Sequence, residues 1–191
     1  GQDDRLLVDV AQSHGATLLQ RLSMYRLRAA VQIAQTDLVV SRGTGSTPPG
    51  ALPDPRHAGM GWRFYGESDI SDQTDWDALR VAHLIPETGI ELTPDTYVLE
   101  AGFEALHGVD FRKGCYVGQE IVARMKHKTD LRKGLARVRI DGVARPGDPI
   151  TADGKDTGVL HTISGDHAIA YLRFDRATGP MQAGRATITL A

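Results

Sequence analysis

The chain has 191 residues, of which 41% are hydrophobic and 24% charged, a composition typical of a globular protein. Its length allows one large or two modest domains with a buried core, and its net charge of −2 gives no general reason to expect a nucleic-acid-binding protein, a class that favours strongly basic domains. The single cysteine excludes an internal disulfide framework and favours a reducing, cytosol-like compartment, and no segment approaches the roughly 18–20 apolar residues that span a bilayer.

The first 66 residues are predicted to contain strands, one helix and a long loop. In chain order, the expected elements are a strand (5–11), a helix starting near residue 13 or 16, two strands around a turn (27–40), a loop (41–55) and a strand (60–66). The helix is predicted because Leu18, Leu19 and Leu22 recur at helical spacing. The loop is predicted because Gly, Pro, Ser and Thr dominate its residues.

The clearest helix pattern covers residues 74–89. Thr74 is a favourable N-cap residue, and Asp75 and Asp77 lie in the first turn, where the helix dipole favours negative charge. Pro86 is expected to end this helix, because proline lacks a backbone N–H and clashes with the preceding turn.

Two further helices are predicted before residue 130. One covers residues 99–108, with Gly108 at the position after its last turn. The other begins immediately after Gly118, because apolar residues such as Ile121 and Met125 share one face.

From about residue 130 the pattern changes to short β-runs separated by Gly, Asp and Pro turns. Strand and turn spacing of this kind is typical of a small barrel or sandwich. We therefore expect a domain boundary near residues 129–134, which gives domains over 1–130 and 131–191.

The only cysteine lies in the stretch RKGCYVGQEIVA, residues 112–123. Two cations precede Cys115 and a helix start follows it, and both favour thiolate over thiol. This pattern predicts a reactive, redox-sensitive or metal-seeking cysteine, whereas the alternative is a small buried residue in a tight turn. Gly114 and Gly118 are predicted to bracket a turn that needs unusual backbone angles or allows close backbone approach. Glu120 also has two interpretations, a ligand contact or a carboxylate that complements the helix dipole.

Several common catalytic and cofactor motifs are absent from the sequence. There is no P-loop, no GxGxxG fingerprint, no HExxH pair and no GxSxG elbow. One cysteine with dispersed histidines does not suggest a zinc site, which needs about four ligands at set spacings. The chain can supply at most one of the roughly four thiolates of a conventional iron–sulfur cluster. We therefore assign no metal ligands from the sequence.

The stretch KGCYVGQE, Lys113 to Glu120, resembles the signature of the YgfZ-type folate-binding proteins, relatives of the glycine-cleavage aminomethyltransferase (T-protein). Further segments resemble the family in the same order along nearly the whole chain: 22–31, 54–63, 107–128 and 145–164. The family implies a role in making or maintaining iron–sulfur clusters, with an indirect link to tRNA modification through cluster enzymes. It also implies a cytoplasmic protein, or a mitochondrial matrix protein in a eukaryote.

The resemblance implies an α+β fold in two parts. The first part is a ferredoxin-like, T-protein-like folate-binding body, and the second is a small C-terminal antiparallel β-barrel. Because the resemblance begins inside that body, we expect the chain to contain only part of it.

The cofactor implied by the resemblance is tetrahydrofolate or a folate derivative. Glu100 lies in YVLEAG, which resembles the T-protein segment with the pterin-binding glutamate, and a carboxylate can accept two parallel hydrogen bonds from a pterin. The alternative role for Glu100 is a first-turn carboxylate of the 99–108 helix. Arg26 and Arg28 are candidates to pair with the glutamate carboxylates of folate, and the alternative is a solvated strand end. The other residues implied are the functional thiol of Cys115, folate contacts at Tyr116, Gln119 and Glu120, and motif positions at Lys113, Gly114, Gly118 and Arg124.

Three functions are compared on these features. The first is a tetrahydrofolate-binding accessory protein that works with iron–sulfur assembly proteins or cluster enzymes, without direct contact to nucleic acid or membrane. The second is a folate-dependent aminomethyltransferase like the T-protein, although the cysteine motif argues against it because transfer to folate needs acid–base groups rather than a thiol. The third is a structural interaction module in which the motif is only a turn.

Overall fold

The computed structural model of the chain describes residues 5–127 and 131–191. The chain forms two compact units, one made of Gly1–Leu52 and Trp62–Asp72, the other of Pro53–Gly61 and Gln73–Ala191. The expected end of the first domain, residue 130, lies outside the described residues, and the extents of the two domains stay a prediction. Within the described ranges, no helix has both the length and the apolar character needed to cross a bilayer.

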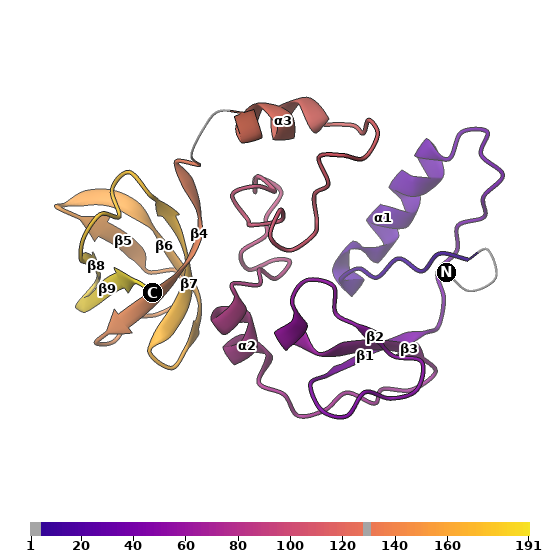
Figure 1. Cartoon of the computed structure of the whole chain (residues 1–191), viewed down its shortest axis with the longest axis horizontal. Helices are drawn as coiled ribbons and strands as arrows, with labels where there is room; N and C mark the ends of the chain where they lie inside the picture. Colours follow the sequence, from indigo (N-terminus) through magenta and orange to yellow (C-terminus); the bar gives the residue numbers. More distant parts are fainter. Residues whose placement is uncertain (1–4, 128–130) are drawn as a thin grey trace. The chain divides into compact units, whose positions relative to one another are not determined.

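The first unit combines one helix with a three-stranded sheet in the order β1-β3-β2 (Figure 1). Its elements are α1 (Gln12–Tyr25), β1 (Val39–Gly43), β2 (Leu52–Pro53) and β3 (Trp62–Gly66). β1 and β3 are antiparallel, with Gly43 opposite Trp62. A Cβ atom at Gly43 would lie 2.3 Å from the Trp62 ring, so this pairing requires a glycine.

Several expectations for the first 55 residues are wrong. Residues 6–11 form no strand, and the first of the two strands expected over 27–40 is absent, because the described strand begins only at Val39. Leu27 takes a left-handed φ of 48° directly after α1. Most side chains in these segments are exposed, so pairing them as strands would bury little apolar surface and gain little stability. The predicted loop over 41–55 is interrupted at both ends, by β1 and by β2.

The second unit begins with a short 3-10 turn, η1 (Ala58–Met60), and the helix α2 (Trp76–His83). Asp75, not Thr74, is the N-cap residue of α2, since its carboxylate accepts a hydrogen bond from the Ala78 N–H at 2.9 Å. The helix ends at Leu84, which has a left-handed φ of 54°. Pro86 therefore lies beyond the cap and does not itself end the helix.

The helix expected over residues 99–108 does not form, and the segment is a series of turns. Gly102 interrupts it with a φ of +76°, which a right-handed helix cannot contain. The segment closes with a hydrogen bond from the Gly108 N–H to the Phe103 carbonyl at 2.7 Å, and His107 has a left-handed φ of 59°.

The C-terminal part is a closed six-stranded antiparallel barrel with the strand order β4-β7-β6-β5-β8-β9 (Figure 1). Its strands are β4 (Lys133–Asp141), β5 (Pro149–Ala152), β6 (Lys155–Ser164), β7 (His167–Arg173), β8 (Met181–Ala183) and β9 (Ala186–Leu190). Pairing of β4 with both β7 and β9 closes the sheet. The predicted mixed α+β fold with a C-terminal barrel is confirmed.

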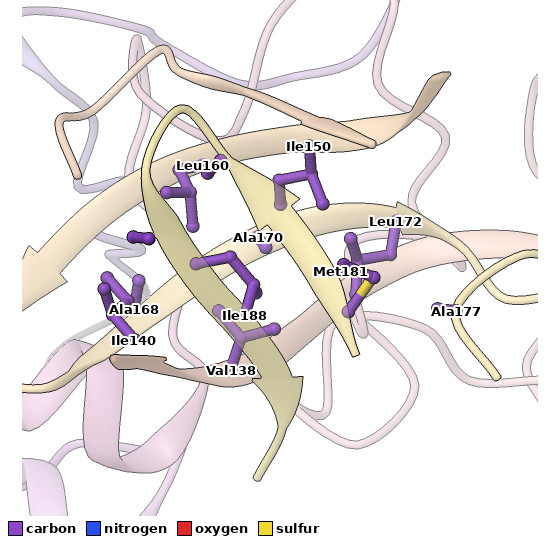
Figure 2. Packing of buried hydrophobic residues seen from close by; sticks show 12 residues of the cluster. Val138, Ile140, Ile150, Leu160, Ala168, Ala170, Leu172, Ala177, Met181 and Ile188 are labelled. Carbon is purple, nitrogen blue, oxygen red and sulfur yellow. The ribbon is translucent and has the colours of Figure 1, made fainter. Parts of the chain in front are cut away.

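Side chains from alternating strand positions fill the barrel (Figure 2). Along β7, Ala168, Ala170 and Leu172 point inward and are fully buried. Ile169 and Tyr171 lie on the other face, where Ile169 joins a second buried cluster with Val81, Ala101 and Leu135. Both faces of β7 are therefore covered, which explains why its sequence is nearly continuously apolar.

A buried ionic network attaches α2 to the barrel. Arg80 is 2% exposed and donates hydrogen bonds to the Glu91 carboxylate and, at 3.1 Å, to the Thr162 hydroxyl of β6. The second Glu91 oxygen accepts from the Thr162 hydroxyl at 2.5 Å, and the Arg80 Nε donates to the Ile85 carbonyl at 3.1 Å. Both buried charges are thus paired and hydrogen-bonded, as buried charges need to be.

The free energy of unfolding is expected to fall as the pH drops from about 7 to about 5. Burial lowers the pKa of His83, and the nearby His57 and Arg137 lower it further. Burial also lowers the pKa of His161, against the opposing effect of Glu91. Both imidazoles bind a proton less readily when folded, so the stability that they contribute is present above the unfolded pKa near 6.5 and is lost below it. Chemical denaturation at both pH values checks this, and His83→Gln should flatten the dependence; an unchanged slope contradicts it.

Candidate functional site

The cysteine motif leads directly into the helix α3 (Gln119–His127), whose start after Gly118 confirms the sequence prediction. The Gln119 side-chain oxygen accepts a hydrogen bond from the Tyr116 N–H at 3.1 Å, and the Gln119 N–H donates to the Tyr116 carbonyl at 3.3 Å. This reciprocal pair resembles a capping box, in which a side chain three residues into the turn satisfies an otherwise free N–H. Gln119 therefore has a structural role at the helix start.

Cys115 is exposed, so the interpretation as a small buried residue is wrong. The neighbouring Lys113 places its ammonium 5.1 Å from the centre of the half-buried Tyr116 ring, a distance suited to a cation–π contact. The Arg112 N–H donates to the Asp110 carboxylate at 2.8 Å, which shapes the chain just before the motif. The thiol is thus presented to solvent on a turn whose neighbouring residues contact one another.

Glu120 and Arg124 lie one turn apart on the same side of α3, and both are exposed. Lys126, also on α3, bonds both carboxylate oxygens of Glu104 at 2.6 and 2.8 Å and lies 5.2 Å from the centre of the Phe111 ring. These contacts tie the helix to the turns that precede the motif. The cations after the motif are Arg124, Lys126, His127 and Lys128, and Lys128 lies outside the described residues.

Gly118→Ala is expected to destabilise the start of α3 by about 1 kcal/mol, because Gly118 has a φ of +90° that a Cβ disfavours. Gly114→Ala is the matched control, since its φ is not in the left-handed region and nothing lies within 4 Å of an added Cβ. Hydrogen exchange of the amides in α3 checks the difference. Equal exchange in the two variants contradicts the prediction.

Glu100 is held at two points by neighbouring strands of the barrel. Its carbonyl accepts a hydrogen bond from the Leu135 N–H of β4 at 2.8 Å, and its carboxylate Oε2 accepts from the Tyr171 hydroxyl of β7 at 2.6 Å. Leu135 and Tyr171 are direct cross-strand partners. Gly134 permits the close approach, since a Cβ there would lie 2.9 Å from the Glu100 carbonyl oxygen.

Glu100 is not a first-turn helix carboxylate, because the helix expected over residues 99–108 does not form. Burial, followed by the hydrogen bond to Glu100 and its charge, raises the pKa of Tyr171 above the usual tyrosine value. The Tyr171 hydroxyl therefore stays protonated at neutral pH and acts as a donor, which leaves the Glu100 carboxylate as the acceptor.

The structure places the predicted site residues in separate groups. Glu100 and residues 113–124 belong to the second unit, whereas Arg26 belongs to the first, where it ends α1 and donates to the Val31 carbonyl at 3.1 Å. Among the described residues, no hydrogen bond or ion pair joins Glu100 to the cysteine motif. The folate contacts expected of these side chains stay a prediction.

Tyr171 and Gly134, the residues that locate Glu100, were not predicted from the sequence. Tyr171 lies in a continuous apolar strand and carries no local signal for a polar contact. The only sign in the sequence was Gly134, which directly precedes Leu135 in β4. A glycine inside a strand can mark a place where another backbone approaches closely.

The described surface includes two open hollows, and neither is lined by Glu100 or Cys115. One, of about 160 Å³, lies beside α2 and β7 and is lined by Ala78, Val81, Ala82, Arg137, Ser164 and His167. The other, of about 270 Å³, follows α1 and is lined by Thr17, Gln20, Arg21, Met24 and Tyr25. Over the described ranges, no three His, Cys, Asp or Glu side chains gather in a way that could hold a metal ion.

Comparison with known proteins gives consistent matches. Residues 132–191 match the family model described as the CAF17 C-terminal beta-barrel domain. The chain is 30% identical over 210 residues to the mitochondrial iron-sulfur cluster assembly factor IBA57 of Mus musculus, covering 92% of the chain and 58% of that protein. It is also 30% identical over 86 residues to the tRNA-modifying protein YgfZ of Aliivibrio fischeri, covering 44% of the chain and 27% of that protein. The chain is therefore similar to the IBA57 and YgfZ proteins, and its C-terminal barrel to that of CAF17.

One further relative is named as a transferase. The chain is 34% identical over 90 residues to the putative chloroplastic transferase At1g60990 of Arabidopsis thaliana, covering 47% of the chain and 20% of that protein. The chain spans less than two thirds of the length of the IBA57 relative from mouse. The similarity to IBA57 and YgfZ proteins confirms the resemblance to YgfZ-type proteins that was stated on KGCYVGQE.

Proposed function

We propose that the chain is a tetrahydrofolate-binding accessory protein in iron–sulfur cluster assembly or repair, and that it supports tRNA modification only through the enzymes that need clusters. The observation that carries the proposal is the exposed Cys115 on the turn before α3, in a chain similar to a protein named as a cluster assembly factor. Its expected partners are folate and the assembly proteins or cluster enzymes.

The thiol side of the proposal rests on accessibility. Cys115 is exposed and follows Lys113 in the turn before α3. A thiol in this position is open to a disulfide or to a metal, two partners with which cysteine reacts. Cys115 would then contact a cluster, a metal or a redox partner delivered by another protein.

The folate side of the proposal rests on Glu100. A pterin presents ring N–H and amino groups in parallel, and an ionised carboxylate is the acceptor that matches them. Tyr171 occupies Oε2 of Glu100 as a donor, and a carboxylate oxygen has a second acceptor site. The carboxylate therefore keeps acceptor capacity for a pterin, and Tyr116, Gln119 and Glu120 are the further contacts that we propose.

Calorimetric titration of the chain with tetrahydrofolate under anaerobic conditions tests the folate role. We expect saturable binding that Glu100→Gln weakens by about tenfold or more, because the amide lacks the charge that strengthens these hydrogen bonds. Glu67→Gln is a matched control at an exposed acidic residue of the first unit. Absence of tetrahydrofolate binding to the unmodified chain would contradict the folate role.

Activity of iron–sulfur enzymes in cells that lack their own IBA57/YgfZ protein tests the thiol role. The chain is expected to restore activity, and Cys115→Ser to lose most of that gain, because a hydroxyl is neither a thiolate nor a soft metal ligand. Thr178→Ala, an exposed change in the barrel, serves as control. Full restoration by Cys115→Ser removes Cys115 from the mechanism.

The second candidate is a folate-dependent aminomethyltransferase, favoured by the similarity to a protein named as a putative transferase. Such an enzyme would transfer a one-carbon unit to folate with the help of acid–base groups rather than a thiol. Glycine-cleavage activity with a lipoylated carrier protein, retained in Cys115→Ser, would favour this candidate over the first.

A further inference from the structure

The barrel determines where the Glu100 carboxylate lies. Leu135 of β4 and Tyr171 of β7 face each other across the sheet, and each bonds a different part of Glu100. One bond locates the backbone and the other locates the end of the side chain. The next residue, Ala101, is 1% exposed and packs in the cluster formed with Leu135 and Ile169.

A carboxylate on a flexible side chain costs conformational entropy when a ligand orders it. The bond from Tyr171 removes part of this cost in advance, because it restrains Oε2 before any ligand arrives. A hydrogen bond to an ionised group is also stronger than one between neutral groups. The remaining acceptor sites of the carboxylate are then presented in one orientation.

We propose that Tyr171 is the positioning residue for the ligand-binding carboxylate of Glu100, so that the C-terminal barrel sets the geometry of the folate site. This inference rests on the proposed folate role of Glu100. Tyr171 acts through Glu100 and needs no contact with the ligand. The barrel is then a working part of the site as well as a stable scaffold.

Tyr171→Phe is the variant that separates positioning from packing. Phenylalanine keeps the ring that packs against the Ala101 cluster and removes only the hydroxyl. Calorimetric titration with tetrahydrofolate is expected to show about tenfold weaker binding, the size of one hydrogen bond to a charged group. The thermal midpoint is expected to stay within a few degrees of the unmodified chain. Tyr65→Phe removes the comparable hydroxyl–carboxylate contact to Asp9 in the first unit and should leave the affinity unchanged.

Two further measurements distinguish positioning from a structural role. In the Glu100→Gln background, Tyr171→Phe should weaken binding by less than about twofold, because the carboxylate that it positions is already gone. In the free protein, ultraviolet absorbance should show one tyrosine of the Glu100→Gln variant ionising at lower pH, since the carboxylate that opposes ionisation of Tyr171 is absent.

The outcomes separate the two proposals. If the unmodified chain does not bind tetrahydrofolate, the folate role fails and the positioning role fails with it. If the chain binds and Tyr171→Phe binds equally well, only the positioning role is overturned. A large loss of thermal stability in Tyr171→Phe, or equal weakening in the Glu100→Gln background, assigns Tyr171 to packing and also overturns the inference.

Discussion

Glu91→Leu is expected to lower the free energy of unfolding by about 3 kcal/mol, the largest single effect that we expect from an ionic contact in this chain. The substitution removes the fully buried carboxylate that pairs with Arg80 and leaves that guanidinium buried with a weaker set of partners. The cost lies at the lower end of the range for broken buried pairs, because Asp77 still accepts from Arg80 at 2.9 Å.

Urea denaturation of three variants checks this expectation. The double variant Arg80→Met, Glu91→Leu should recover most of the loss, because two apolar side chains of similar size can replace a buried pair at little net cost. Glu104→Ala removes an ion pair whose side chains are about half exposed, 48% for Lys126 and 49% for Glu104, and should cost less than about 1 kcal/mol. Equal losses in Glu91→Leu and Glu104→Ala would contradict the importance of the buried network.

Gly158→Ala is the second change with a large expected effect. Gly158 lies in β6 opposite Leu172 of β7. A Cβ at this position would lie 2.0 Å from the backbone oxygen of Tyr171, a distance that no rotamer change can relieve. We expect a loss of about 3 kcal/mol, the upper end for overpacking, because a strand of the closed barrel has to move.

Thermal unfolding of Gly158→Ala against Gly179→Ala checks the second expectation. Gly179 lies in the same part of the chain, with no left-handed φ and nothing within 4 Å of an added Cβ. Its replacement should change the free energy of unfolding by less than about 0.5 kcal/mol. Because the added Cβ would displace the backbone of Tyr171, the variant should also weaken tetrahydrofolate binding if Tyr171 positions Glu100. A stability like that of the unmodified chain would show that β6 and β7 can separate without cost.

Local sequence patterns correctly predicted the elements that depend on turn residues and on the spacing of apolar residues. The start of α3 followed from Gly118 and the apolar face behind it, and the barrel followed from short runs divided by turn residues. The helix expected over 99–108 does not form, because Gly102 takes a positive φ. The spacing of the apolar residues does not reveal this backbone angle. The strands expected before residue 38 failed because alternation alone does not supply a partner strand.

The sequence by itself determined the class of fold, the cysteine motif and the resemblance to YgfZ-type proteins, because periodicity, turn residues and an in-register motif are properties of neighbouring residues. Only the tertiary structure decided that Cys115 is exposed, that Arg80 and Glu91 are buried together, and that Glu100 meets Tyr171. Glu100 and Tyr171 are 71 residues apart in the chain. Contacts at such separation depend on the register of barrel strands and on the packing of turns against them, and no local pattern encodes either.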